Sequence, residues 1–261
     1  MDSRERPERS TQDEEYARSI LLGNHPAMRY GRRVFARLPS DPRCKLCANP
    51  FGGVGGGVMR RLGRAPWPKN PKFCSACFRD MATRHIGAEI ECSLLFADVR
   101  GSTQLAEEMR SSEFRALMDR YFHIAARILV RANAIVDKFV GDEVVAIFIP
   151  AMTGELHAER AVTAARELLA ETADWIPVGA GVNCDTAYVG VVGEGDGADI
   201  TAMGDAVNVT ARLASTAASG EVLVTDSAAR AAGLAHTAVE HRELMLRGRR
   251  KPVEVLVFGP A

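Results

Sequence analysis

Two kinds of hydrophobic pattern follow one another along this chain of 261 residues. From residue 91 onward, short apolar runs alternate with longer stretches in which apolar residues recur every three or four positions. The short runs predict strands and the longer stretches predict helices. Residues 91–258 are therefore expected to form an α+β domain. Residues 13–38 also have helical spacing, and a break near residues 23–26 predicts one or two short helices there.

The predicted strands place two acidic residues at exposed ends. Residues 92–97 (CSLLFA) predict a buried strand, and Asp98 follows it directly. Two β-branched runs, 134–139 and 144–149, flank a Val-Gly-Asp-Glu segment, which predicts a hairpin with Asp142 at its tip. Further strands are expected at 178–182, 187–192, 221–224, 239–246 and 253–258.

Three helices are expected to accompany these strands. A second helix is predicted over about 154–170 and a third after Gly204-Asp205, while the Gly- and Asp-rich residues 193–199 predict a loop. The first helix has an apolar face with spacings of three and four, which predicts packing on the sheet. That face consists of Phe114, Leu117, Met118, Tyr121, Phe122, Ala125, Ile128 and Leu129.

Residues 41–77 are dominated by glycine, proline and basic side chains. The glycine-rich run 51–57 is not expected to keep regular structure unless something outside it holds it. Two Cys-x-x-Cys pairs bracket this segment, and each pair can direct two sulfurs at one ion. Four thiolates make a closed tetrahedral Zn²⁺ site, although an iron–sulfur cluster takes the same ligands and stays an alternative. The four cysteines are Cys44, Cys47, Cys74 and Cys77.

Composition narrows the class of protein. With 47% hydrophobic and 25% charged residues the chain can bury a core, so disorder throughout is excluded. No apolar stretch has the length of a membrane span, and the charged start lacks the apolar run of a signal peptide. A soluble, cytoplasmic protein is expected. Because thiols stay reduced in that compartment, metal binding or burial is favoured over disulfides, and Cys92 and Cys184 are expected in the core.

The net charge of zero conceals two halves of opposite sign. Residues 1–90 hold 17 basic against 9 acidic side chains, and residues 91–261 hold 16 against 24. The basic side chains between the cysteine pairs, with Trp67 among them, raise nucleic-acid binding as an alternative. Because aromatic residues are sparse there, a solvated surface that faces a protein partner is favoured. These basic residues are Arg60, Arg61, Arg64, Lys69 and Lys72.

Asp98 and Asp142 would meet at one edge of the sheet if their strands are neighbours. Paired carboxylates suit Mg²⁺ or Mn²⁺, and two such ions activate an attacking oxygen and neutralise the phosphates that it attacks. The turn Arg100-Gly101-Ser102-Thr103 opens a helix, so its backbone N–H groups are candidates for holding phosphate oxygens. Each feature alone is common turn or cap chemistry; their combination is what indicates a site.

The combination of three segments is more specific. They are FADVRGST at 96–103, KFVGD at 138–142 and TAMGDAVNVTAR at 201–212. Over residues 91–258 the chain resembles the catalytic domain of class III nucleotidyl cyclases. The resemblance implies a ferredoxin-like α+β fold, and a homodimer in which two domains meet head to tail with active sites at their interface. The organisation predicted is an N-terminal helical segment (1–40), a four-cysteine module (41–78), a linker (79–90) and a catalytic domain (91–261).

The resemblance also implies roles for individual residues. Asp98 and Asp142 match the two metal-binding aspartates, with the Val99 carbonyl as a further ligand. Lys138 matches the lysine that reads the purine. Thr201 matches its partner, and threonine at that position is typical of one adenylyl cyclase subgroup.

The same resemblance assigns the reacting end of the nucleotide. Asn208 and Arg212 match the pair that orients the ribose and stabilises charge on the α-phosphate; without the family, a polar helix stripe explains their spacing as well. Arg247 is the candidate for a triphosphate contact, with Arg249, Arg250 and Lys251 as alternatives. Ser102, where many members have an aromatic residue, and the glycine-free segment 183–186 depart from the pattern.

Hydrogen-bonding chemistry favours ATP. Adenine presents an acceptor at N1 and a donor at its amine, which a lysine and a threonine oxygen complement, whereas guanine reverses these roles. The expected reaction is conversion of ATP to 3′,5′-cyclic AMP and pyrophosphate with two Mg²⁺ or Mn²⁺ ions. The alternatives are a guanylyl cyclase and a catalytically silent nucleotide sensor. A third makes the cysteine module an adaptor for a protein or nucleic acid, although nucleic acid is the less favoured partner.

Overall fold

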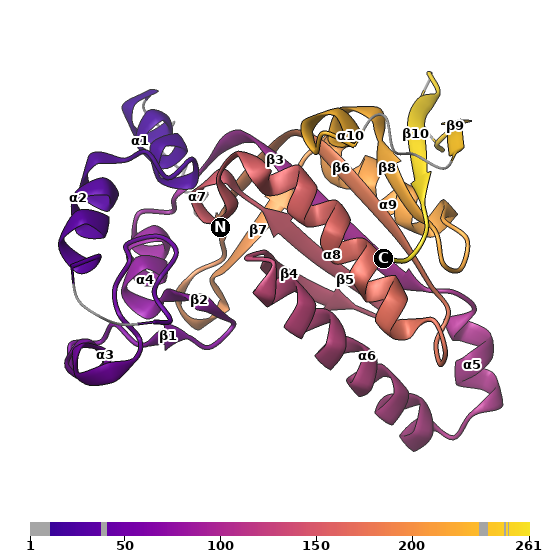
Figure 1. Ribbon diagram of the computed structural model, residues 1–261, viewed down its shortest axis with the longest axis horizontal. Helices are drawn as coiled ribbons and strands as arrows, with labels where there is room; N and C mark the ends of the chain where they lie inside the picture. Colours follow the sequence, from indigo (N-terminus) through magenta and orange to yellow (C-terminus); the bar gives the residue numbers. More distant parts are fainter. Residues whose placement is uncertain (1–10, 38–40, 235–239, 248, 250) are drawn as a thin grey trace, which may run out of the picture.

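The computed structural model of the protein describes residues 11–37, 41–234, 240–247, 249 and 251–261. Within them, an eight-stranded sheet has the order β4-β5-β3-β6-β8-β10-β9, and β7 pairs with the free end of β6 (Figure 1). The strands are β3 (Gly87–Val99), β4 (Ile135–Val140), β5 (Glu143–Phe148), β6 (Val178–Val192), β7 (Asp199–Met203), β8 (Val222–Thr225), β9 (Glu240–Leu244) and β10 (Val253–Phe258).

The centre of the sheet has the topology that the sequence predicted. In chain order, β3, α6, β4, β5, α8 and β6 form two interlocked β-α-β units, and their sheet order places β3 between β5 and β6. Both neighbours run antiparallel to β3. This is the ferredoxin-like arrangement, so the predicted α+β class is confirmed.

Helices cover one face of the sheet (Figure 1). Alternate β3 side chains, including Leu95 and Ala97, point into a core shared with α6, α8 and α10. Tyr121 on α6 is fully buried and donates a hydrogen bond from its hydroxyl to the Ala97 carbonyl at 3.1 Å, so α6 is fixed just before the end of β3. The helices on this side are α5 (Ser102–Glu108), α6 (Ser111–Arg131), α8 (His157–Thr172) and α10 (Asp226–Ala231). Ala151 and Met152 of the short helix α7 (Pro150–Thr153) belong instead to the core on the opposite face.

The N-terminal region covers part of the opposite face. The other set of β3 side chains, including Leu94 and Phe96, belongs to one core with Leu21, Leu46 and Phe73. The N-terminal region and this face of the sheet therefore share one continuous hydrophobic core. Its elements are α1 (Thr11–Leu21), α2 (Pro26–Phe35), α3 (Gly53–Arg61), β1 (Pro66–Trp67), β2 (Asn70–Cys74) and α4 (Ser75–Thr83), and α9 (Asp205–Thr216) also packs on this face.

Most predicted strands are confirmed, with one change that matters for the sheet. The two strands expected at 178–182 and 187–192 form one strand, β6, because the polar residues between them stay paired with β3. Asn183 is buried there, and its amide oxygen accepts a hydrogen bond from Thr225 at 3.0 Å. β7 and α10 were missed. Cys92 and Cys184 are buried, as expected.

The glycine-rich run forms a helix, and the cysteine pairs that bracket it close on each other, which is the outside support that regular structure was expected to need there. α3 begins at Gly53, and Gly56 lies so close to Phe51 that a Cβ there would be 2.4 Å from the Phe51 carbonyl carbon. The run is helical because glycine lets the helix pack tightly on the preceding turn, whose cysteine pair closes on the second pair.

No helix among the described residues is long and apolar enough to cross a membrane.

Candidate active site

Asp98 and Asp142 come from neighbouring strands, as the sequence predicted. Asp98 lies next to the last position of β3, directly opposite Glu143 of β5, and Asp142 occupies the turn that joins β4 to β5. The two aspartate carboxyls lie close enough for Asp142 to raise the pKa of Asp98. We call Asp98, Asp142 and Glu143 the carboxylate cluster.

Burial and the neighbouring acids make two members of this cluster, Asp98 and Glu143, hold protons more tightly than free carboxyls do. Burial and the neighbouring Asp142 raise the pKa of Asp98 to about 6, although Arg100 opposes the shift. Burial, with Asp98 and Asp142 next, raises the pKa of Glu143 to about 7. Asp98 and Glu143 therefore resist ionisation, and a cation would best neutralise their charge.

Arg100 is the one cation that touches the cluster among the residues described. Its guanidinium forms an ion pair with the Asp98 carboxylate and also donates to the Ser215 carbonyl at 2.9 Å, at the end of α9. Gly101 follows with a φ of +69°, a left-handed conformation that glycine adopts without strain, and it caps α5. The predicted turn at Gly101, Ser102 and Thr103 therefore stands next to the carboxylates.

Lys138 and Thr201 meet although 63 positions separate them in the sequence. β7 lies beside β4, and the Lys138 ammonium donates a hydrogen bond to Thr201 Oγ1 at 3.1 Å. Thr201 Oγ1 in turn donates to Asp137 Oδ2 at 2.8 Å, and that oxygen is 3.2 Å from Lys138 Nζ. We call these three residues the Lys138 triad.

Asp137 and Glu143 were missed by sequence reasoning. Only 5% of the Asp137 side chain is exposed, and burial raises its pKa while Thr201 and Lys138 oppose the shift. The signal was an acid inside a predicted strand, where an unpaired carboxylate is costly. Glu143 gave no comparable signal because an acid in a hairpin turn is common.

Asn208 and Arg212 lie on α9, as predicted, outside its buried stripe. Val209 and Leu213 face the core, whereas Asn208 is exposed and Arg212 is half-buried. Neither side chain has an ion pair or side-chain hydrogen bond within the described ranges. α9 is held close to β6 because Gly181 has no side chain: a Cβ there would be 2.6 Å from the Ala214 nitrogen.

The basic residues near the end of the chain divide into groups. Arg249 forms an ion pair with Asp205 at 3.0 Å and is thereby tied to the start of α9. Arg247 is exposed, and Arg250 lies outside the described residues. The triphosphate contact predicted for Arg247 stays a prediction.

The four cysteines of the two Cys-x-x-Cys pairs converge, and we call them the cysteine cluster. All four sulfurs lie within 4.8 Å of one another, with Cys44–Cys77 at 4.0 Å and Cys47–Cys74 at 3.8 Å. The Cys74 backbone N–H donates to Cys44 Sγ at 3.3 Å. Hydrogen bonds among the thiols raise the pKa of Cys44 and Cys77 and lower that of Cys47 and Cys74.

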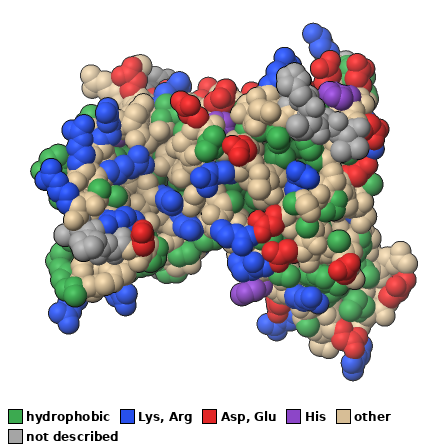
Figure 2. Space-filling model, in the orientation of Figure 1, with side chains coloured by type: hydrophobic (Ala, Val, Ile, Leu, Met, Phe, Trp, Pro, Cys, Tyr) green, Lys and Arg blue, Asp and Glu red, His purple; other side chains and the backbone are tan. Residues whose placement is uncertain are grey.

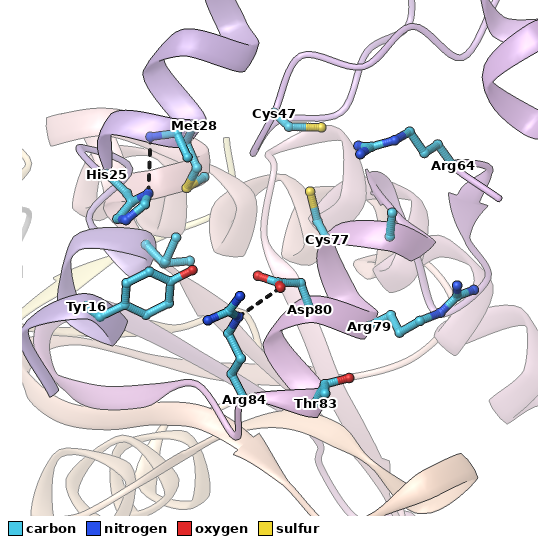
Figure 3. Close-up of a pocket in the computed structure, with 13 residues that line it drawn as sticks. Tyr16, His25, Met28, Cys47, Arg64, Cys77, Arg79, Asp80, Thr83 and Arg84 are labelled. Carbon is cyan, nitrogen blue, oxygen red and sulfur yellow. Dashed lines mark hydrogen bonds and ion pairs between the residues drawn. The ribbon is translucent and has the colours of Figure 1, made fainter. Parts of the chain in front are cut away.

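A cavity of about 620 Å³ adjoins the cysteine cluster, between α1, α2 and α4 (Figure 3). Cys47 and Cys77, the two half-exposed members, line it, and Arg64 extends toward the gap between them. On its other side, Arg84 donates to Asp80 at 3.0 Å and lies over the Tyr16 ring. The cluster is therefore open to small molecules on one side.

The basic side chains of the N-terminal region are spread over its surface (Figure 2). Trp67, in contrast, is buried and stacks on Phe78 and Phe73, with ring centroids 4.0 and 5.1 Å apart. It is part of the module's core and is not presented to a nucleic-acid base. Trp67 therefore does not support the alternative that this module binds nucleic acid.

The N-terminal region also touches the strands that carry Lys138 and Thr201. Lys69 forms an ion pair with Asp199, the first residue of β7, at 2.6 Å. Asn70 donates its side-chain amide to the Ala134 carbonyl at 2.9 Å, one residue before β4. Arg32 donates to the Leu46 carbonyl at 3.0 Å and to the Ala151 carbonyl at 3.0 Å, and so connects a cysteine pair to α7.

Comparison with solved structures finds the same fold. The guanylyl cyclase Cya2 aligns with a TM-score of 0.62 and 24% identity over 67% of this chain and 95% of that one. The adenylyl cyclase CyaB from P. aeruginosa aligns with a TM-score of 0.60 and 24% identity over 67% of this chain and 97% of that one.

Relatives by sequence are longer proteins. An uncharacterized protein of Mycobacterium tuberculosis, Rv1319c, is 27% identical over 202 residues, which are 69% of this chain and 38% of that protein. An adenylate cyclase of Anabaena cylindrica is 30% identical over 135 residues, 46% of this chain and 26% of that protein. The alignment with Rv1319c spans less than two fifths of that protein's length.

A family model settles the identity of residues 87–258. The model of the adenylate and guanylate cyclase catalytic domain matches this range, which is most of the chain and includes the carboxylate cluster, the Lys138 triad and α9. The chain therefore belongs to the adenylate and guanylate cyclase catalytic domain family.

Proposed function

We propose that the protein is an adenylyl cyclase, which converts ATP to 3′,5′-cyclic AMP and pyrophosphate. The observation that carries the choice of ATP is the Lys138–Thr201 hydrogen bond, because it holds a donor and an oxygen acceptor side by side. Adenine needs that pair at N1 and at its amine. Guanine presents the reverse pattern and would leave polar groups unpaired, at a cost of about 1–3 kcal/mol each.

The carboxylate cluster fits divalent cations. Oxygen-only ligands suit Mg²⁺ or Mn²⁺, and burial together with the neighbouring acids raises the pKa values of Asp98 and Glu143 even though Arg100 opposes the shift. Asp98 and Asp142 would hold the ions, with the Val99 carbonyl as a further ligand. When bound, such ions lower the pKa of a ribose hydroxyl and offset the charge of a triphosphate.

The chain's own residues supply the remaining roles. In the reaction, the ribose 3′-oxygen forms a bond to the α-phosphorus, the bond from that phosphorus to the bridging oxygen of the β-phosphate breaks, and the hydroxyl proton leaves. Arg212 stabilises the charge that develops on the α-phosphate, and Asn208 orients the ribose. The backbone N–H groups of Gly101, Ser102 and Thr103 receive phosphate oxygens.

The active form that we propose is a homodimer with the site at the interface. In this arrangement the carboxylate cluster of one chain works with the Lys138 triad, Asn208 and Arg212 of the other. The exposed position of Asn208 on α9 supports the proposal, since a side chain that orients a nucleotide at an interface must be accessible in the single chain.

The cysteine cluster supports a single tetrahedral Zn²⁺. With Zn–S bonds of about 2.3 Å, the sulfurs at the corners of a tetrahedron lie about 3.8 Å apart. The observed separations of 3.8 and 4.0 Å match this edge, and an iron–sulfur cluster spreads its cysteines more widely. We propose that this module regulates the cyclase, because Lys69 and Asn70 touch the starts of the two strands that carry Thr201 and Lys138.

The test is an assay for cyclic nucleotide with ATP or GTP and Mn²⁺ or Mg²⁺. Wild-type protein should form cyclic AMP, and Asp98→Ala and Arg212→Ala should each lose activity by about a hundredfold or more. The matched control is Asp119→Ala, which removes an exposed carboxylate on α6 that pairs with Arg115. Absence of product under every condition would contradict the proposal and favour a silent sensor. Equal product from the variants would show that Asp98 and Arg212 do not carry the reaction.

The zinc proposal has its own measurement. Purified protein should contain one zinc per chain by elemental analysis, and Cys44→Ser should lower that content. Iron with inorganic sulfide in place of zinc would show that the cluster assignment is wrong.

A further inference from the structure

The buried carboxylate of Asp137 contacts both residues that we propose to contact the purine, Lys138 and Thr201. Asp137 lies next to Lys138 on β4, yet its side chain is 5% exposed and that of Lys138 is 47% exposed. Asp137 Oδ2 accepts from Thr201 Oγ1 at 2.8 Å and lies 3.2 Å from Lys138 Nζ. With the Lys138–Thr201 bond at 3.1 Å, the three polar atoms form a closed triangle.

The triangle fixes the direction of the threonine hydroxyl. A hydroxyl has one proton to donate and two lone pairs to accept with. The carboxylate takes the proton, since the other acceptor in reach, the Ala202 carbonyl, is 3.5 Å away. Lys138 takes one lone pair, so Thr201 Oγ1 can offer a ligand only an acceptor.

The same accounting applies to the lysine. An ammonium group has three protons. One goes to Thr201 and one to Asp137, which leaves one for a ligand. The triad as a whole therefore presents one donor and one acceptor, the complement of adenine N1 and its amine.

Without Asp137 this selectivity would weaken. A free threonine hydroxyl can turn and donate its proton to the carbonyl oxygen O6 of guanine as readily as it accepts from the adenine amine. Asp137 is an acceptor only, and its hydrogen bond removes the option of donating to O6.

We infer that Asp137 is a specificity-determining positioning residue, which fixes Thr201 as an acceptor and so favours ATP over GTP. The inference rests on the proposed cyclase function and names the residue that sets its substrate. Asp137 acts through Thr201 and does not touch the nucleotide.

The experiment compares kcat/KM for ATP and for GTP in full-length protein. Asp137→Leu should lower the ATP-to-GTP ratio by about tenfold, through better use of GTP, because one mismatched polar contact is relieved. Asp137→Asn should lower the ratio less, since its amide can still accept from the hydroxyl in one of two orientations. Asp119→Leu, at an exposed carboxylate on α6, should leave the ratio unchanged.

A double-variant cycle separates specificity from support of the fold. Thr201→Val removes the hydroxyl through which Asp137 acts, so adding Asp137→Leu should not change the ratio further. An unchanged ratio in both Asp137 variants, an equal loss with ATP and GTP, or the same shift in the Thr201→Val background would overturn the inference. Wild-type protein that forms no cyclic nucleotide would refute the proposed function itself.

Discussion

The carboxylate cluster and the Lys138 triad differ in how their polar groups are satisfied. In the triad every charge has a partner in the same chain: Lys138, Asp137 and Thr201 bond to one another. In the carboxylate cluster the Arg100 guanidinium forms an ion pair with Asp98, Asp142 and Glu143 have no ion pair among the described residues, and the pKa values of Asp98 and Glu143 are raised. The polar groups of the triad are therefore satisfied within the chain, whereas the carboxylate cluster keeps the unbalanced negative charge that the proposed divalent cations would neutralise.

The largest change in ATP kinetics is expected when a charge is reversed in the Lys138 triad. Lys138→Glu places a second carboxylate beside buried Asp137 and removes the donor for adenine N1. We expect ATP kcat/KM to fall by about a hundredfold, since both a like-charge contact and an unpaired base atom are created. Steady-state kinetics with ATP give the answer, and unaltered ATP kinetics would show that the purine assignment is wrong.

The contribution of the carboxylate cluster to the stability of the fold should depend on both pH and bound metal. The folded pKa of Asp98 is raised from 3.8 to about 6 and that of Glu143 from 4.5 to about 7, so folded protein keeps protons that the unfolded chain releases. This contribution to stability is complete below about pH 4 and is lost as pH rises through about 6–7.

Thermal unfolding with and without Mn²⁺ measures the consequence. Mn²⁺ should raise the Tm more at about pH 8, where the acids are ionised, than at about pH 5, where protons compete with the ion. Asp98→Asn should reduce the difference. A Tm increase that is the same at both pH values in wild-type protein would mean that the cluster does not bind the metal.

A smaller effect is expected where the N-terminal region contacts the triad's strands. Lys69→Met removes the ion pair with Asp199 and keeps the length of the side chain. Exposed pairs contribute about 0–1 kcal/mol, so we expect the KM for ATP to rise by about two- to fivefold with kcat nearly constant. Arg18→Met, which removes an exposed pair with Glu14 within α1, is the matched control. Equal kinetics for the two variants would show that the Lys69–Asp199 ion pair does not affect the binding of ATP.

The sequence predicted the carboxylate end more completely than the triad. Asp98 and Asp142 lie at the ends of predicted strands, so local pattern brought them together on the condition that these strands are neighbours, which the pairing of β3 with β5 confirms. Asp137 was missed because its partner Thr201 lies on β7, which was not predicted as a strand; the loop predicted at 193–199 shares only Asp199 with it. The hydrogen bonds of Thr201 arise only when β7 lies beside β4, and no local pattern encodes that contact.

The N-terminal region shows the same limit. The spacing of Cys44, Cys47, Cys74 and Cys77 predicted their convergence, which the structure confirms. It did not predict the helix at Gly53–Arg61 or the burial of Trp67, because both depend on packing around the closed cysteine cluster.

The most direct test of the account asks whether the two ends of the site come from different chains. Asp98→Ala and Arg212→Ala chains, each inactive alone, are co-expressed with different tags and purified through both tags. A site shared between chains leaves one intact site in each mixed dimer, so about half the wild-type cyclic AMP formation should return. No recovery in the mixed dimer, with wild-type protein active in the same assay, would contradict the account.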